Sequence, residues 1–148
     1  MSTAGNGEFV HIVRVGWGHC DPARIAYTAR LPEFALEAID AWWEHHFGTG
    51  WYQMELDTGT GTPFVHLELD FRSPVTPRHR LHCHVRPVRL GSRSIEFRVA
   101  GYQDGTLCFE GRFVSVFIHA GSMRTRTAPE HIRARITAMI AAGAAVPS

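Results

Sequence analysis

The residues best suited to carry out chemistry lie in one segment, residues 18–28, which reads GHCDPARIAYT. Its single carboxylate, Asp21, is followed by Pro22, which fixes the backbone after the acid and disfavours the helical conformation at Asp21 itself. Gly16 and Gly18 allow the chain to bend sharply before it. A carboxylate held in such a loop can act as a nucleophile or a general base, and it can equally be a turn or capping residue.

This segment resembles a motif of the hot-dog-fold acyl-CoA thioesterases, the 4-hydroxybenzoyl-CoA thioesterase family, where GDCDPAGIVWY and DTDAGGVVYH occupy the matching place. The resemblance implies that Asp21 is catalytic, as nucleophile or general base, and that the backbone N–H of Thr28 stabilises the oxyanion. It also places Tyr27 against the substrate. Thr28 stands where relatives have tyrosine or histidine, and Arg24 where glycine is common, so no histidine side chain acts at position 28.

Coenzyme A requires cations for its phosphates, and arginine is well suited to them. Seven arginines lie within residues 72–98, and residues 88–95, VRLGSRSI, resemble the turn that contacts the nucleotide portion in the family. The resemblance implies substrate contacts from Arg89, Ser92, Arg93 and Ser94. A solvated, arginine-rich hairpin is the alternative. The Gly61-Thr62-Pro63 segment matches a GTP segment beside the ligand in aromatic-substrate enzymes, which implies a further contact from Thr62.

Other chemistries have weaker signals. Cys20 lies beside His19, but neighbouring side chains of an extended loop usually diverge, so a thiol–imidazole pair is not expected. His82 and His84 would share one face of a strand near His79, but no further ligand follows from the spacing, and exposed or interface histidines are favoured. We therefore expect no metal and no cofactor, with coenzyme A as part of the substrate.

Hydrophobic periodicity predicts the elements that position these residues. Apolar alternation predicts a strand over residues 8–17, and near-helical spacing predicts a long helix over 31–47. Further strands are expected over residues 63–71, 79–89, 93–103 and 106–119, with a low-complexity turn at 57–62 and a second helix opening at Pro129. Pro87 is expected at a bulge or an edge, and Asp104-Gly105 predicts a hairpin turn.

This order predicts an α+β fold, and the resemblance identifies it as the hot-dog fold, a five-stranded antiparallel sheet wrapped around a long central helix with a short C-terminal helix. One domain over residues 1–148 is expected, with residues 1–7 and 141–148 frayed. The family buries its sites between subunits, which implies a homodimer or homotetramer. Trp42 is expected in the core and Trp43 is free to face a partner subunit.

Composition limits the other functions. The 148 residues are 45% hydrophobic, the net charge is +1, and all fifteen basic residues are arginine. These values predict no general attraction to nucleic acid or membranes and exclude lysine chemistry. Three cysteines without paired spacing argue against a disulfide framework, and the absence of an apolar run or leader pattern predicts a cytoplasmic protein.

These observations together predict an acyl-CoA thioesterase that releases a free acid and coenzyme A. An aromatic acyl group such as benzoyl or hydroxybenzoyl is slightly favoured, because the CDPA sequence is closer to the aromatic-substrate branch of the family. The alternatives are a thioesterase acting on acyl carrier protein and a non-catalytic, acyl-CoA-binding hot-dog protein.

Overall fold

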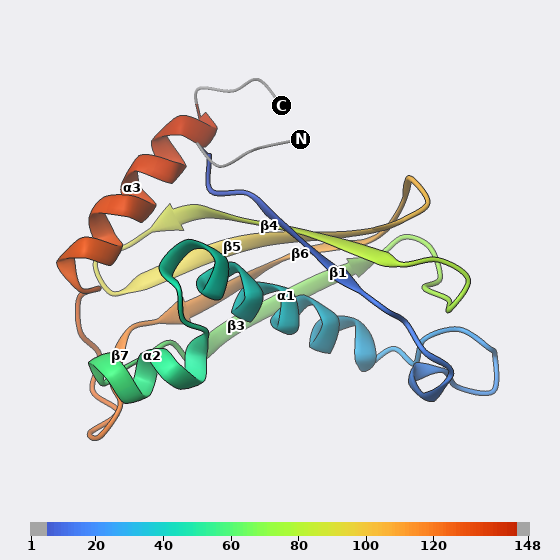
Figure 1. Cartoon of the computed structure of the whole chain (residues 1–148), viewed down its shortest axis with the longest axis horizontal. Helices are drawn as coiled ribbons and strands as arrows, with labels where there is room; N and C mark the ends of the chain where they lie inside the picture. Colours follow the sequence, from blue (N-terminus) through green and yellow to red (C-terminus); the bar gives the residue numbers. More distant parts are fainter. Residues whose placement is uncertain (1–5, 145–148) are drawn as a thin grey trace.

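The computed structural model describes residues 6–144, which form a five-stranded antiparallel sheet packed against a long helix (Figure 1). The strand order in the sheet is β1-β4-β5-β6-β3, and β2 pairs with β7 in a separate two-stranded sheet. The strands are β1 (Phe9–Val13), β2 (Thr60–Gly61), β3 (Phe64–Phe71), β4 (Leu81–Leu90), β5 (Ser94–Gln103), β6 (Thr106–Val116) and β7 (Ile118–His119). The helices are η2 (Trp17–His19), α1 (Arg30–Phe47), α2 (Trp51–Thr58) and α3 (Glu130–Ala144).

Helix α1 packs against β1, β4 and β5 through a wide apolar stripe. Ala35 and Ala38 are fully buried, and their small side chains allow close approach to the sheet. Trp42 lies in the core as expected. Trp43 is equally buried and makes edge contacts with Phe97 and Phe117, so the expectation that it faces a partner subunit is wrong. The stripe is broad enough to include both neighbouring tryptophans.

Strand β4 contains the predicted irregularity at Pro87. The pairing with β5 shifts register between Pro87 and Arg89. Before this shift Leu81, Cys83 and Val85 alternate into the core, and an unshifted strand would direct Arg89 the same way. The shift instead places Arg89 opposite Glu96, where it is exposed. A single extra residue therefore keeps a guanidinium out of the core.

Strand β3 forms one edge of the sheet, and only part of its apolar side, at Phe64 and Leu69, packs against the core. Leu67 and Phe71 pair with the buried Phe113 and Phe109 and so share the helix-facing side, yet they are 42% and 53% exposed. The alternation predicted for this strand is therefore correct, but its apolar side is largely open to solvent. An uncovered, apolar edge strand is a surface that pairs readily with another chain.

Several boundaries differ from those expected. The first strand ends at Val13, and Trp17 lies in η2 with its side chain exposed. Helix α2 and the β2–β7 pair were not anticipated, because residues 51–62 have weak periodicity and their pairing partner is far away in the sequence. Gly7 is buried and residues 141–144 are helical, so these parts of the predicted frayed ends are ordered. Residues 1–5 and 145–148 lie outside the described residues.

Helix α3 packs through Ile132, Ile136 and Met139, which join the core of α1 and the sheet. It lies against β4. At the opposite end of the sheet, Asp104 and Gly105 form the predicted turn between β5 and β6, with φ angles of 48° and 79°. Within residues 6–144, no helix has the length and apolarity needed to cross a lipid bilayer.

Candidate active site

Asp21 lies in a tight loop between η2 and α1. Cys20 and Ala26 form an isolated antiparallel bridge, and the Asp21 N–H donates to the Ile25 carbonyl at 3.1 Å. The loop closes through Arg24, which has a φ of 66° and donates its N–H to the Asp21 carbonyl at 2.9 Å. Arg24 stands where the related motif commonly has glycine, and the positive φ explains that preference. Its side chain is exposed.

The carboxylate of Asp21 is half-buried and partly occupied. Its Oδ1 accepts the Ala23 N–H at 2.8 Å, which closes an Asx turn of the kind expected for a turn aspartate. Within residues 6–144, no protein hydrogen bond occupies the other carboxylate oxygen. One oxygen therefore fixes the orientation of the carboxylate, while the other is available to a substrate or a water molecule.

The loop leads directly to the beginning of α1. Tyr27 donates its N–H to the His19 carbonyl at 2.9 Å, and Ala26 donates to Val75 at 2.7 Å, which ties the loop to the segment after β3. The N–H groups of Thr28 and Ala29 have no acceptor among the described residues. Free amides at a helix N-terminus favour negative charge, so this end of α1 can stabilise an oxyanion.

A second group of predicted residues lies together at the other end of the sheet. Pro63 accepts a hydrogen bond from the Val116 N–H at 3.0 Å, and Val116 pairs with Ser94. Arg93 accepts one from Phe117 at 2.9 Å. Thr62, next to Pro63, is 8% exposed, and its Oγ1 has no hydrogen-bond partner among the described residues. The Thr62 segment and the turn at residues 91–94 are therefore neighbours.

The two groups do not meet within one chain. The Asp21 loop is bonded to Val75, beyond the end of β3, whereas Thr62 precedes the start of β3. The eight residues of β3 span roughly 25 Å. Figure 1 shows the loop before α1 (blue) at one end of the sheet and β7, α2 and α3 at the other. Within one chain the two groups of predicted residues are therefore separated by the length of β3.

The competing side-chain clusters do not form a reactive centre. His19 Nδ1 accepts the Gly16 N–H at 3.0 Å, and the His19 ring packs against Phe34. This nitrogen is therefore already occupied and does not pair with the Cys20 thiol. His82 and His84 line a groove of about 670 Å³ on the face of the sheet away from α1. Among residues 6–144, no three His, Cys, Asp or Glu side chains are arranged to hold a metal ion.

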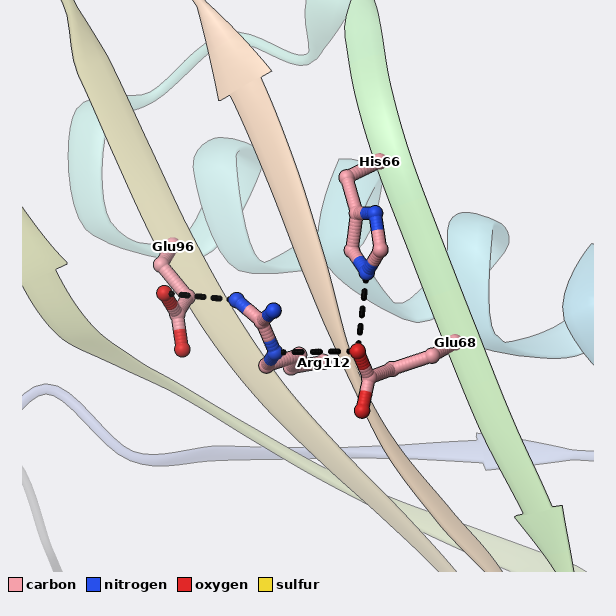
Figure 2. A network of polar contacts seen from close by, with 4 residues as sticks. All are labelled: His66, Glu68, Glu96 and Arg112. Carbon is pink, nitrogen blue, oxygen red and sulfur yellow. Dashed lines mark hydrogen bonds and ion pairs between the residues drawn. The ribbon is translucent and has the colours of Figure 1, made fainter.

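Ion pairs cover the same outer face of the sheet (Figure 2). Arg112 donates to Glu68 and to Glu96, both at 3.2 Å, and Glu68 also accepts from His66 at 2.8 Å. The His66 hydrogen bond, together with the charge of Arg112, lowers the pKa of the Glu68 carboxyl. These residues neutralise one another on an exposed face and link β3, β6 and β5, so they contribute modestly to strand pairing rather than to chemistry.

Sequence reasoning missed two arginines that support the end of the sheet that contains Thr62. Arg126 donates to Thr60 Oγ1 at 3.2 Å. Arg133, on α3, donates from Nη2 to the carbonyl of Gly91 at 3.0 Å and to that of Ser92 at 2.8 Å. In the sequence, Arg133 is seen only as a cation next to the apolar Ile132, and that position does not indicate which groups the guanidinium contacts.

Comparisons with known proteins give a consistent result. The sequence model of the Thioesterase-like superfamily matches residues 15–136. A thioesterase superfamily structure from Jannaschia sp. CCS1 has 62% identity and a TM-score of 0.84, covering 87% of this chain and 90% of that one. A 1,4-dihydroxy-2-naphthoyl-CoA thioesterase from Synechocystis has 17% identity and a TM-score of 0.78, with 88% and 96% coverage.

A gentisyl-coenzyme A thioesterase has 18% identity and a TM-score of 0.76, covering 84% of this chain and 99% of that one. At these lower identities the similarity concerns the fold, and it confirms the hot-dog architecture expected from the sequence. No curated protein matches the chain.

Proposed function

Because the chain belongs to the Thioesterase-like superfamily, we propose that it is a thioester hydrolase that acts on an acyl-CoA, with Asp21 as its catalytic carboxylate. One observation carries the assignment of the site: a carboxylate fixed through Oδ1 lies in the same loop as two uncommitted N–H groups at the start of a long helix. Thioester hydrolysis requires this combination, because the carbonyl carbon must be attacked while its oxygen becomes negative.

The chemistry follows from these groups. The free oxygen of Asp21 either attacks the thioester carbon to give a mixed anhydride or removes a proton from an attacking water molecule. In both routes the Thr28 N–H stabilises the oxyanion until the carbon–sulfur bond breaks. In the first route coenzyme A leaves as a thiolate; water then cleaves the anhydride to the free acid and the Asp21 carboxylate, and a proton released from that water neutralises the thiolate. In the second route the proton held by Asp21 passes to the departing sulfur, which leaves as the thiol.

We further propose that each active site contains residues of two chains. Antiparallel pairing of two β3 edges would bring the start of β3 in one chain beside the end of β3 in the other. The partner's Thr62 and its turn at residues 91–94 would then lie near the Asp21 loop, which cannot happen within one chain. The open apolar side of β3, with Leu67 and Phe71, supports this arrangement. The chain would form at least a homodimer, and pairing of two dimers would give a homotetramer.

The proposed site residues divide between the two ends of the sheet, the Asp21 end of one chain and the Thr62 end of its partner. At the Asp21 end, Thr28 supplies its N–H and Tyr27, which is 55% exposed, offers a surface for the acyl group. At the partner's end, Arg89, Ser92, Arg93 and Ser94 would meet the nucleotide portion of coenzyme A. Thr62, with its unpartnered hydroxyl, would meet a polar group of the acyl portion.

An aromatic acyl group is the proposed substrate class, as in the 4-hydroxybenzoyl-CoA thioesterase family. The CDPA motif supports this choice. Two neighbours of the same fold are named for 1,4-dihydroxy-2-naphthoyl-CoA and gentisyl-coenzyme A, which are thioesters with aromatic acyl groups. The chemistry requires only water and the protein's own residues.

The proposal is tested by measuring hydrolysis of benzoyl-, hydroxybenzoyl- and alkyl-CoA thioesters together with the same acyl groups on acyl carrier protein. We expect the highest kcat/KM for an aryl-CoA. A preference for the carrier protein would transfer the assignment to that substrate. Tight binding without turnover would identify a binding protein instead.

The two-chain site has its own test, in which Asp21→Asn chains are mixed with chains carrying Arg89→Ala and Arg93→Ala and allowed to exchange. A site shared between chains gives each heterodimer one intact site, and kcat/KM at low substrate should recover to about a quarter of the wild-type value. A site within one chain would leave every site defective and give no recovery.

A further inference from the structure

The turn between β4 and β5 lacks the backbone conformation that two-residue hairpin loops favour. Gly91 donates its N–H to the Ser94 carbonyl at 2.9 Å, which leaves Ser92 and Arg93 as a two-residue loop. Two-residue hairpin loops favour positive φ angles, because these match the twist of the strands. Among residues 6–144, positive φ occurs at neither Ser92 nor Arg93. A contact from outside the hairpin can therefore add to the stability of this turn.

Arg133 supplies that contact from α3. Its Nη2 donates to the carbonyls of Gly91 and Ser92, at 3.0 Å and 2.8 Å, across 42 and 41 residues of sequence. Hydrogen bonds from a charged donor are stronger than those between neutral groups. The two carbonyls belong to consecutive peptide units, so one guanidinium fixes the orientation of both.

The same two peptide units contain the N–H groups of Ser92 and Arg93. In a planar trans peptide the N–H points away from the C=O, so these N–H groups are directed away from Arg133. Neither has an acceptor among the described residues. A cation on the carbonyl also polarises the peptide and strengthens its N–H as a donor. The turn therefore presents two adjacent, activated donors to solvent.

Cations lie beside these donors. Arg89 and Arg93 are exposed, and neither forms an ion pair within the part of the chain that the structure describes. Successive backbone N–H groups flanked by guanidinium groups are suited to a phosphate. Resting on the function proposed above, we propose that Arg133 is a positioning residue that holds the Ser92 and Arg93 amides as donors to a phosphate of coenzyme A.

The first test compares Arg133→Ala with Arg135→Ala. Arg135 is on the same helix and lies 4.4 Å from the centroid of the Phe47 ring, so its loss removes the same charge without touching the turn. Each variant is assayed with an acyl-CoA and with the corresponding acyl-pantetheine, which lacks the nucleotide phosphates. We expect Arg133→Ala to raise KM for the acyl-CoA about tenfold while leaving kcat and the acyl-pantetheine KM unchanged. Arg135→Ala should match the wild type.

Equal effects of Arg133→Ala on both substrates would overturn the proposal, because a general loss of structure affects both. So would an unchanged KM for the acyl-CoA. A milder pair of variants tests the donor directly: Ser92→Pro removes the hydroxyl and the N–H, whereas Ser92→Ala removes only the hydroxyl. We expect Ser92→Pro to raise the acyl-CoA KM about fivefold above Ser92→Ala. Identical KM values for the two would exclude the amide as a donor.

Binding of free coenzyme A, measured by calorimetry, separates this proposal from the proposed function. If the wild type hydrolyses no thioester, the proposed function fails, while a roughly tenfold weaker affinity of Arg133→Ala for coenzyme A than of Arg135→Ala would still support the positioning role. If turnover is normal and both variants bind coenzyme A like the wild type, the positioning role fails and the hydrolase assignment stands.

Discussion

The two ends of the sheet are held in different ways. At the Asp21 end, the loop is closed mainly by its own backbone, with Asp21 bonded to Ala23 two residues away. At the other end, side chains reach across the sequence: Arg133 across 42 and 41 residues, and Arg126 across 66. A locally bonded loop can be recognised from a short stretch of sequence. An end assembled by distant side chains depends on the whole fold.

The largest effect should come from the locally bonded end. Asp21→Asn keeps an oxygen that can accept the Ala23 N–H, so the loop should retain its shape. The amide is neither a nucleophile nor a base, and kcat should fall about 10³-fold with KM for the acyl-CoA nearly unchanged. Steady-state kinetics with an aryl-CoA measure this split.

Asp104→Asn is the matched control, because it makes the same chemical change in an exposed turn of the sheet. It should leave kcat unchanged. If Asp21→Asn keeps wild-type turnover, Asp21 is only the capping residue of an Asx turn, and the proposed catalytic role is wrong.

The second effect tests whether the Asp21 end of one chain and the Thr62 end of its partner form one active site. Leu67→Lys places a charge on the open apolar side of β3 and should separate the subunits. Because each site would lose its second half, kcat/KM should fall about 100-fold. Analytical ultracentrifugation and kinetics on the same sample measure both results.

Ile12→Lys is the control for Leu67→Lys. Ile12 is also exposed and lies on β1, the opposite edge strand of the sheet. Its substitution should leave the subunits associated and the activity intact. A fully active Leu67→Lys monomer would contradict the shared site.

The contrast between the ends also explains what the sequence could predict. The order of the five main strands along the chain, the long helix and the Pro87 bulge follow from periodicity and backbone chemistry, and the structure confirms them. The Asp21 loop was found because its geometry depends on adjacent residues. The β2–β7 pair and the contacts of Arg133 depend on residues that are distant in sequence, so no local pattern encodes them. Trp43 was misplaced because a helical stripe alone does not give the width of the buried face.

A third effect tests another long-range contact of the same type, at Gly7. The Gly7 carbonyl is bonded to Trp42 Nε1 at 2.6 Å and to His46 Nε2 at 3.1 Å, across 35 and 39 residues. Burial is the main cause that lowers the pKa of His46, to about 4. Between pH 6.5 and 4 the unfolded chain therefore binds more protons than the folded one, and the free energy of unfolding should fall as pH falls, by about 3 kcal/mol in total.

Urea unfolding at several pH values measures this dependence. His46→Gln should remove most of this dependence, whereas His131→Gln, at an exposed histidine on α3, should retain it. The same pH slope in both variants would mean that other groups cause the acid sensitivity.

The smallest effect contrasts the two hairpin turns directly. Gly105 has a φ of 79°, so Gly105→Ala places a side chain in the left-handed region and should cost about 1 kcal/mol of stability, lowering Tm by a few degrees. The turn is far from the predicted phosphate donors, so KM should not change.

Arg133→Ala should do the reverse: it should raise KM for the acyl-CoA and change Tm only slightly. Calorimetric melts and kinetics on both variants test the distinction: a turn that maintains its own backbone geometry contributes to stability, while one held by a distant arginine contributes to substrate binding. If Gly105→Ala raises KM as much as Arg133→Ala does, the two turns do not differ in function.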